Sequence, residues 1–258
     1  MLATVEINKK IICSSFQKRW ETYDRYALAQ KSIAKDLMQK TVSLFPERSF
    51  GKVFELGCGS GLLTRELIQA YKAEQFFLND LCSDLEFRLS QIMNDKAWSF
   101  HPGDIEVIDF PSEVDMIISS STFQWVNNLD ALFQKISSSL NPGGILAFST
   151  FGSQNIYQFS QLSGNVLNYF NPEDIKSKLD PFFDDIYFVE KKEDVYFNSV
   201  EDVFTHLKLS GVNAFKSSGF NRSKYLKIKN GLSEILEEEK KITLSYHPLY
   251  FWGRKKEY

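Results

Sequence analysis

Features that mark several classes of protein are scarce or missing in this chain of 258 residues. Its three cysteines, Cys13, Cys58 and Cys82, lie far apart with no C-x-x-C pair, so neither a disulfide framework nor a zinc site is expected. The three histidines show no metal-ligand spacing either. No apolar run approaches the roughly 18–20 residues that a membrane span needs. The expected setting is therefore a reducing cytoplasm, with no bound metal and no membrane.

A basic excess is lacking as well. The chain has 30 Lys and Arg against 33 Asp and Glu, a net charge of −3, so no nucleic-acid partner is expected. The start of the chain has no basic segment followed by an apolar core, so no secretory signal is expected. Hydrophobic residues make up 43% and aromatic residues 15%, which predicts a globular protein with an aromatic-rich core.

Hydrophobic patterning divides the chain into three parts. Residues 1–50 carry apolar residues at helical spacing, which predicts a helical segment. Residues 51–151 alternate short apolar runs with helical patterns, which predicts right-handed βαβ units and a parallel sheet. Residues 152–258 predict further helices and two more strands, including one strand at 242–253. We expect the helices of this last part to form a lid over the edge of the sheet that binds the ligand.

The loop at 55–61, Glu-Leu-Gly-Cys-Gly-Ser-Gly, carries the most information about function. It follows a predicted strand and precedes a predicted helix, a context in which glycines let the backbone approach a ligand. It lacks the lysine of a phosphate-binding P-loop, and its third glycine comes one residue early for a dinucleotide fingerprint. Glu55, just before the first glycine, would repel a pyrophosphate and attract a cationic amino group.

Two further acids follow the next predicted strands. Asp80 is placed to accept hydrogen bonds from both hydroxyls of a ribose, and Asp104 from the exocyclic amine of adenine. Each acid alone fits a solvated loop carboxylate equally well. Together with Glu55 they describe a ligand with an ammonium, a ribose and an adenine but no phosphate, which is the description of S-adenosylmethionine.

The loop at 55–61 resembles motif I of the class I methyltransferases. Nearly the whole chain resembles one family among them, the malonyl-acyl-carrier-protein O-methyltransferases of biotin synthesis (BioC type). The similar segments are residues 7–34, 121–126, 145–151, 206–213 and 244–251. The chain departs from the family pattern at 79–82, where Asn-Asp-Leu-Cys replaces the commoner Asp-x-Ser, and at Ser60, which replaces the usual Thr.

This resemblance implies a fold and a reaction. The fold is a Rossmann-like, seven-stranded, mostly parallel α/β sheet with a terminal antiparallel hairpin, N-terminal helices over the cofactor and a helical lid insertion. The reaction transfers a methyl group from S-adenosylmethionine to the free carboxylate of a malonyl thioester on an acyl carrier protein, an early step in making the pimeloyl part of biotin. Because that carboxylate is already ionised at pH 7, no general base and no catalytic side chain is expected.

The resemblance also implies the residues of the site. Gln124 and Trp125 are expected at the substrate, and Lys208 is the first candidate for holding the malonyl carboxylate. Trp125 fits a packing role as well, and Lys208 fits an ordinary solvated lysine. The residues expected to bind the cofactor are Tyr23, Gln30, Glu55, Gly57, Cys58, Gly59, Gly61, Asp80, Leu81, Asp104, Ile105 and Ser119.

An acyl carrier protein is acidic, so a basic docking surface is expected on a monomeric enzyme. Two basic clusters are candidates for it, namely Lys9, Lys10, Lys18 and Arg19 in one and Lys216, Arg222, Lys224, Lys227 and Lys229 in the other. Two alternatives stay open. The chain fits a methyltransferase of a small free carboxylic acid such as an aconitate, and it fits a cofactor-binding assembly factor that transfers no methyl group.

Overall fold

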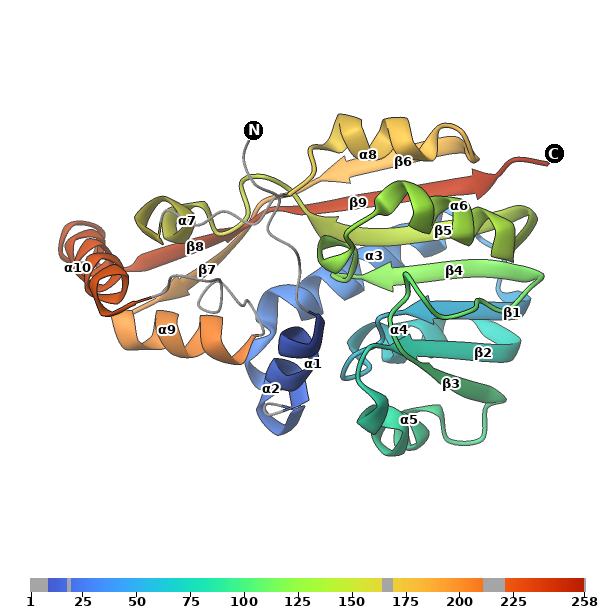
Figure 1. Ribbon diagram of the computed structural model, residues 1–258, viewed down its shortest axis with the longest axis horizontal. Helices are drawn as coiled ribbons and strands as arrows, with labels where there is room; N and C mark the ends of the chain where they lie inside the picture. Colours follow the sequence, from blue (N-terminus) through green and yellow to red (C-terminus); the bar gives the residue numbers. More distant parts are fainter. Residues whose placement is uncertain (1–8, 18–19, 164–168, 211–220, 258) are drawn as a thin grey trace.

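The computed structural model describes residues 9–17, 20–163, 169–210 and 221–257 (Figure 1). Five strands form the parallel part of its main sheet: β1 (Ser49–Leu56), β2 (Lys72–Asp80), β3 (Trp98–Pro102), β4 (Val114–Ser120) and β5 (Leu140–Phe151). Two antiparallel strands, β9 (Pro248–Lys255) and β6 (Phe183–Glu190), complete the order β3-β2-β1-β4-β5-β9-β6. The predicted seven-stranded, mostly parallel sheet is therefore confirmed.

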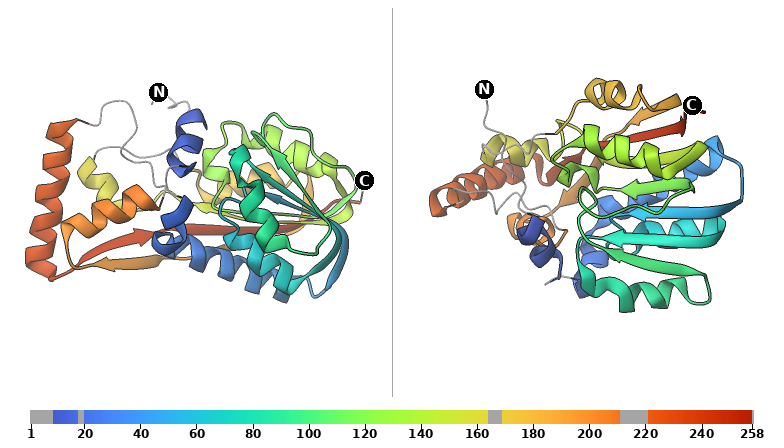
Figure 2. Two further views of the ribbon diagram at one scale, coloured as in Figure 1. Left: turned by 90° about the horizontal axis from the view of Figure 1, so that it is seen from below. Right: turned by 45° about the vertical axis from the view of Figure 1, so that its right-hand side comes forward.

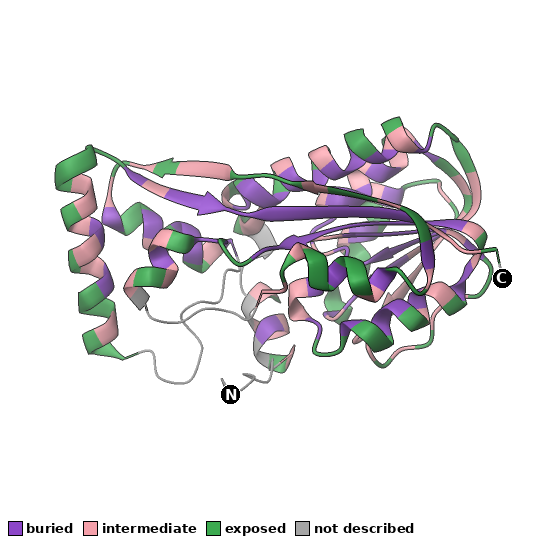
Figure 3. Cartoon of the chain, turned by 90° about the horizontal axis from the view of Figure 1, so that it is seen from above, coloured by how far each residue is buried: buried purple, intermediate pink, exposed green. Residues whose placement is uncertain are grey.

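Helices cover both faces of this sheet, as the alternation of strands and helices predicts (Figure 1). One face packs against α3 (Leu28–Leu44), α4 (Leu62–Ala70) and α5 (Glu86–Met93). The other packs against α6 (Leu129–Ser139) and α8 (Pro172–Leu179). Successive side chains of a strand point to opposite faces, so Val53 joins the first core and Phe54 the second. Figure 3 shows the central strands of the sheet mostly buried between the two helical layers, whereas the edge strand β6 is largely exposed.

The N-terminal segment predicted as helical is divided into three helices. Between α2 (Trp20–Tyr26) and α3, Ala27 leaves the helical conformation with φ −80° and ψ 48°. The helix α3 is anchored to the sheet, where the indole nitrogen of Trp252 donates to the Thr41 hydroxyl at 2.8 Å. The helices α1 (Lys9–Gln17) and α2 instead lie at the carboxyl ends of the parallel strands (Figure 1).

The described residues of the C-terminal part form four strands, β6, β7 (Glu193–Phe197), β8 (Ile242–Tyr246) and β9, where two were expected. The predicted strand at 242–253 is interrupted at His247, because Pro248 has no N–H to continue a ladder. The first half, β8, pairs with β7 in a separate two-stranded sheet, and the second half is β9.

The long β8–β9 ribbon connects the main sheet to a group of outlying helices, α7 (Tyr157–Ser163), α9 (Val200–Leu209) and α10 (Arg222–Glu239) (Figure 2). A helix was expected at 154–169, of which residues 164–168 lie outside the described part. No described helix is long and apolar enough to span a bilayer. Domain boundaries at 50 and 151 and a lid role for these helices stay predictions.

The aromatic core between β5 and β9 yields a test of the packing. Phe148 is 1% exposed and stacks on Phe251 with ring centroids 5.2 Å apart. Phe148→Ala should lower the free energy of unfolding by about 3–5 kcal/mol, because it leaves a cavity in a close-packed layer. Urea denaturation followed by circular dichroism measures this change. Phe87→Ala, at a position 77% exposed, is the control and should change stability by less than about 0.5 kcal/mol. Equal losses in both variants would contradict the assigned core.

Candidate active site

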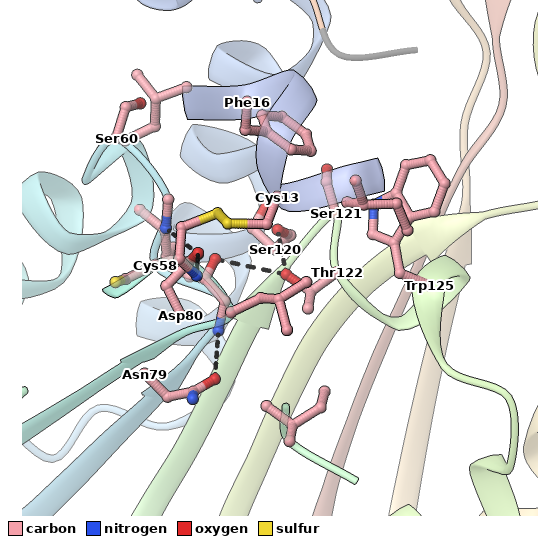
Figure 4. Close-up of a pocket in the computed structure, with 18 of the residues that line it drawn as sticks. Cys13, Phe16, Cys58, Ser60, Asn79, Asp80, Ser120, Ser121, Thr122 and Trp125 are labelled. Atoms are coloured by element: carbon pink, nitrogen blue, oxygen red, sulfur yellow. Dashed lines mark hydrogen bonds between the residues drawn. A yellow bond between two sulfur atoms is a disulfide. The ribbon is translucent and has the colours of Figure 1, made fainter. Parts of the chain in front are cut away.

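A cavity opens at the carboxyl ends of β1, β2 and β4, against α1 and α2 (Figure 4). Its empty volume is about 980 Å³, counting the part open to solvent. We call it the first cavity. It gathers residues that the sequence predicted for the cofactor from five separate segments: Tyr23, Gln30, Gly57, Cys58, Gly59, Asp80, Leu81, Asp104 and Ile105.

The glycines of the loop after β1 have different structural tasks. All three adopt positive φ, which favours glycine: Gly57 at 70°, Gly59 at 51° and Gly61 at 83°. A Cβ on Gly57 would collide with Thr122, and one on Gly61 with Ile92, so these two glycines permit close packing. A Cβ on Gly59 would meet nothing within 4 Å, so Gly59 keeps part of the first cavity open.

Asp80 holds the glycine loop in place. Its carboxylate accepts a hydrogen bond from the Gly59 backbone N–H at 2.9 Å and another from the Cys82 N–H at 2.9 Å. Burial raises the pKa of Asp80 to about 6, although these two bonds favour the ionised form. Each carboxylate oxygen has a second lone pair, so Asp80 retains acceptors for the hydroxyls of a ligand.

Asn79 also lines the first cavity, which the sequence analysis did not predict. Its side-chain oxygen accepts from the Gly57 N–H at 3.4 Å, and its amide group donates to the backbone oxygens of His101 at 2.8 Å and Gly103 at 2.9 Å. Asn79 therefore connects the ends of β1, β2 and β3. This contact gives a structural role to the residue at which the chain departs from the family pattern.

Glu55 does not line the first cavity. It points to the same face of β1 as Val53, towards α4, and is 1% exposed. Burial raises its pKa to about 8, the Asp80 carboxylate adds to that rise, and Thr64 on α4 opposes it. Both carboxylate oxygens of Glu55 are buried and have no hydrogen-bond partner among the described residues. Its expected attraction for a ligand ammonium stays a prediction.

Three other predicted residues also lie away from the first cavity. Gly61 caps α4, and the Ser119 hydroxyl donates to the backbone oxygen of Leu56 at 2.8 Å. Gly61 and Ser119 therefore support the glycine loop from outside the first cavity. Lys208 is exposed on α9 and lines no cavity described for this chain.

The helix α1 is fastened to the rim of the first cavity at two points. Lys9 donates to the Asp104 carboxylate at 2.6 Å and also pairs with Glu106. Cys13 forms a disulfide with Cys82, their Cα atoms 5.5 Å apart, against the expectation that the cysteines are unpaired. The two lie 69 residues apart, so only the tertiary fold brings them together. Cys58 is free and buried, and burial raises the pKa of its thiol, so it is no ready nucleophile.

A second cavity, with about 410 Å³ of empty space, adjoins the first. The two share Phe16, Tyr23, Gln30, Ser121 and Trp125. The second cavity also holds Gln124, whose amide donates to the Ser121 backbone oxygen at 2.5 Å. Sequence analysis missed the remaining lining residues, which are the last residue of β5, Phe151, and three residues after that strand, Asn155, Tyr169 and Ser210.

No group of three or more His, Cys, Asp or Glu residues able to hold a metal ion occurs in the described part of the chain.

Comparison with known proteins assigns a class to this fold and site. Residues 28–182 match a family model described as a methyltransferase domain. The YcgJ protein of Bacillus subtilis superposes with a TM-score of 0.61 at 10% identity, covering 86% of this chain and 99% of that one. The N-methyltransferase NodS of Bradyrhizobium japonicum, solved with S-adenosylhomocysteine, gives 0.57 at 13% identity, covering 95% and 98%. The chain thus carries a methyltransferase domain, and its fold is that of the class I methyltransferases.

Curated relatives narrow this class to a family. Malonyl-[acyl-carrier protein] O-methyltransferases match at 33% identity in Bacteroides fragilis, 32% in Bacteroides thetaiotaomicron and 32% in Haemophilus influenzae. These matches cover 99%, 97% and 98% of this chain. The chain spans about half the length of the first relative, at 52%, and nearly all of the other two, at 99% and 97%. It belongs to the malonyl-[acyl-carrier protein] O-methyltransferase family, which confirms the resemblance found in the sequence.

The open space over Gly59 yields a test of the first cavity. Gly59→Ala should weaken S-adenosylmethionine binding by about tenfold or more, because the added methyl group occupies space that the cofactor needs. Gly143→Ala is a matched control, since Gly143 also has positive φ, at 71°, and open space around it. It should keep the affinity of the unmodified protein. Titration calorimetry measures both, and unchanged binding to Gly59→Ala would contradict the assignment.

We expect Asp80 to make the affinity of the protein for S-adenosylmethionine depend on pH. Below its pKa of about 6 the carboxyl group gains a proton and loses acceptor strength towards hydroxyl donors. S-Adenosylmethionine affinity should therefore fall as the pH drops through 6, by up to about tenfold per pH unit, and level off above 7. Asp80→Asn should bind more weakly and lose this dependence, whereas Glu55→Gln should keep it. An affinity that stays constant between pH 5 and 7 would exclude Asp80 from cofactor binding.

Proposed function

We propose that this protein transfers a methyl group from S-adenosylmethionine to the free carboxylate of a malonyl group carried by an acyl carrier protein, an early step of biotin synthesis. The observation that carries the proposal is the continuity of the two cavities in a chain of this family. The first cavity suits the nucleoside, and the second opens beside it for the acyl group. We place the reaction in the cytoplasm, on a monomer.

The residues of the first cavity fit S-adenosylmethionine. Asp80 retains acceptors for the ribose hydroxyls. Asp104, whose carboxylate accepts a hydrogen bond from Lys9, would accept one from the adenine amine. The side-chain oxygen of Gln30 is buried and has no hydrogen-bond partner among the described residues. A buried acceptor without a partner is costly, and the ammonium of the cofactor would satisfy it. Phe16 and Trp125 supply apolar walls that exclude water.

The reaction requires little from the protein beyond the alignment of the two reacting groups. When bound, S-adenosylmethionine would supply a methyl carbon attached to a sulfonium. The carboxylate oxygen would form a new C–O bond to this carbon while the C–S bond breaks. The electron pair of the C–S bond would stay on sulfur, and no proton would move. The protein's task is to hold two groups in line within a dry cavity.

Acyl-carrier docking is assigned to the first turns of α10. Arg222 and Lys227 are exposed there, next to Tyr225 and Leu226, which are 38% and 45% exposed. A basic surface with apolar residues between the charges suits an acidic protein. In the N-terminal cluster, Lys9 is held in ion pairs, Lys10 is exposed on α1, and Lys18 and Arg19 lie outside the described residues. Lys216, which the sequence analysis grouped with the residues of α10, also lies outside them.

The reaction itself is tested with purified protein and labelled S-adenosylmethionine. Malonyl-acyl-carrier protein, malonyl-CoA, acetyl-CoA and free aconitate are offered in parallel, and products are identified by mass spectrometry. We expect a methyl ester on malonyl-acyl-carrier protein and none on acetyl-CoA or aconitate. Methylation of aconitate alone would establish the small-acid alternative, and cofactor binding without any methyl ester would support the assembly-factor alternative.

Docking on α10 is tested by charge reversal. The double variant Arg222→Glu, Lys227→Glu should raise KM for malonyl-acyl-carrier protein by about tenfold, because it repels an acidic partner. KM for malonyl-CoA should stay the same, since that substrate does not need the protein surface. Lys72→Glu, at an exposed position at the opposite end of the sheet, is the control. A double variant with unchanged KM for the carrier substrate would remove α10 from docking.

A further inference from the structure

The second cavity carries a few hydroxyl and amide groups in a largely apolar lining, and none of its described lining residues is positively charged. In the described part of the chain its lining is aromatic, hydroxyl, amide and apolar, with no lysine, arginine or histidine. The nearby buried His206 contacts Tyr246, and burial lowers the pKa of its ring to about 4, so it is neutral at pH 7. Lys208, expected from the sequence to hold the carboxylate, is exposed on α9.

Tyr169 presents a hydrogen-bond donor to this cavity. Its hydroxyl oxygen accepts from the Asn155 amide at 2.8 Å, which leaves the hydroxyl proton free to donate elsewhere. Asn155 is itself fixed, because its side-chain oxygen accepts from the His247 backbone N–H at 3.2 Å. Burial raises the pKa of Tyr169 to about 12, so the hydroxyl keeps its proton at any pH the enzyme meets.

Ser121 presents a second donor. It adopts φ 55°, a left-handed conformation that costs free energy for a residue with a side chain. The conformation is held by the Ser121 backbone N–H, which donates to the Ser149 backbone oxygen at 3.0 Å. The Ser121 hydroxyl oxygen is buried and lacks a hydrogen-bond partner among the described residues, although Ser121 lines both cavities. A strained residue with an unsatisfied hydroxyl at the junction of two cavities points to a ligand (Figure 4).

Tyr23 lies close to the same place. Tyr23 lines the second cavity together with Tyr169 and Ser121. It also lines the first cavity and packs edge-on against Phe16 with ring centroids 5.5 Å apart. Hydroxyl groups from α2, from the loop after β4 and from the segment before α8 thus surround one space.

We propose that Tyr169 and Ser121 hold the malonyl carboxylate by neutral hydrogen bonds, with Tyr23 beside them and no lysine in contact. This inference rests on the proposed function and specifies how its substrate is recognised. Low polarity around buried donors strengthens their bonds to an anion, so a cation is not needed for binding.

Neutral donors also suit the reaction better than a cation does. The carboxylate loses its negative charge as the ester forms, so its charge is largest in the bound substrate and smaller in the transition state. A lysine in contact would stabilise the substrate more than the transition state and would slow the transfer. Hydroxyl donors depend less on the full charge and can still bond the carbonyl oxygen of the ester.

The test measures binding without methyl transfer. Protein loaded with S-adenosylhomocysteine is titrated with malonyl-CoA and with acetyl-CoA, which lacks the carboxylate. The unmodified protein should prefer malonyl-CoA by about tenfold or more, and Tyr169→Phe and Ser121→Ala should each remove most of that preference. Acetyl-CoA should bind both variants as before, which shows that each is folded, and Tyr169→Phe should also keep its affinity for S-adenosylhomocysteine.

Two controls sharpen the result. Tyr157→Phe makes the same change on α7, where the side chain is 50% exposed, and should keep the malonyl preference. Lys208→Ala should keep it too. Loss of the preference in Lys208→Ala, or its survival in both Tyr169→Phe and Ser121→Ala, would overturn the inference. So would an unmodified protein that does not distinguish the two thioesters.

Failure of the proposed function would look different. If S-adenosylmethionine-loaded protein yields no methyl ester while the malonyl preference depends on Tyr169 and Ser121, the carboxylate site stands and the proposed reaction fails. If the methyl ester forms but neither variant changes the preference, the reaction stands and the neutral site fails.

Discussion

The site depends on one carboxylate, that of Asp80, at the end of β2. It accepts from the Gly59 N–H in the loop after β1 and from the Cys82 N–H in its own loop, so a single group fixes two loops relative to each other. Glycines lack a Cβ and leave the loop many conformations in the unfolded chain, and hydrogen bonds to the Asp80 carboxylate offset the entropy lost when the loop is ordered. Burial of Asp80 has a cost, seen in its raised pKa, and a ligand with paired hydroxyl donors would offset it.

Charge is distributed unevenly between the two joined cavities. The first has acidic groups, Asp80 and Asp104, and Lys9 reaches it from α1. The second has hydroxyl and amide groups and, in the part of the chain that the structure describes, no charged lining residue. This distribution of charge suits a cationic cofactor in the first cavity and an anionic substrate in the second, with their reacting groups where the two cavities meet. Acids attract the cationic cofactor, while the anionic substrate is bound without a fixed cation that would hold it back from reaction.

Local sequence signals predicted the sheet and the first cavity well, because strand ends and glycine loops are encoded by neighbouring residues. Gly57 and Asp80 belong to this group. A motif gives position along a strand, whereas the pleat decides which face a side chain takes, so the motif alone could not show that Glu55 lies outside the lining of the first cavity. The break at His247 was missed because the pattern of alternation continues through it while the pairing changes sheet. Tyr169 was missed since only tertiary contacts bring it to the second cavity.

The account is tested most directly by a crystal structure of the protein with S-adenosylhomocysteine and malonyl-CoA. It predicts the ribose hydroxyls on the Asp80 carboxylate, and the malonyl carboxylate within hydrogen-bond distance of the Tyr169 and Ser121 hydroxyls, facing the cofactor sulfur. A nucleoside bound away from Asp80 would contradict the role of the first cavity. A malonyl carboxylate bound to Lys208 or another lysine would contradict the neutral character of the second.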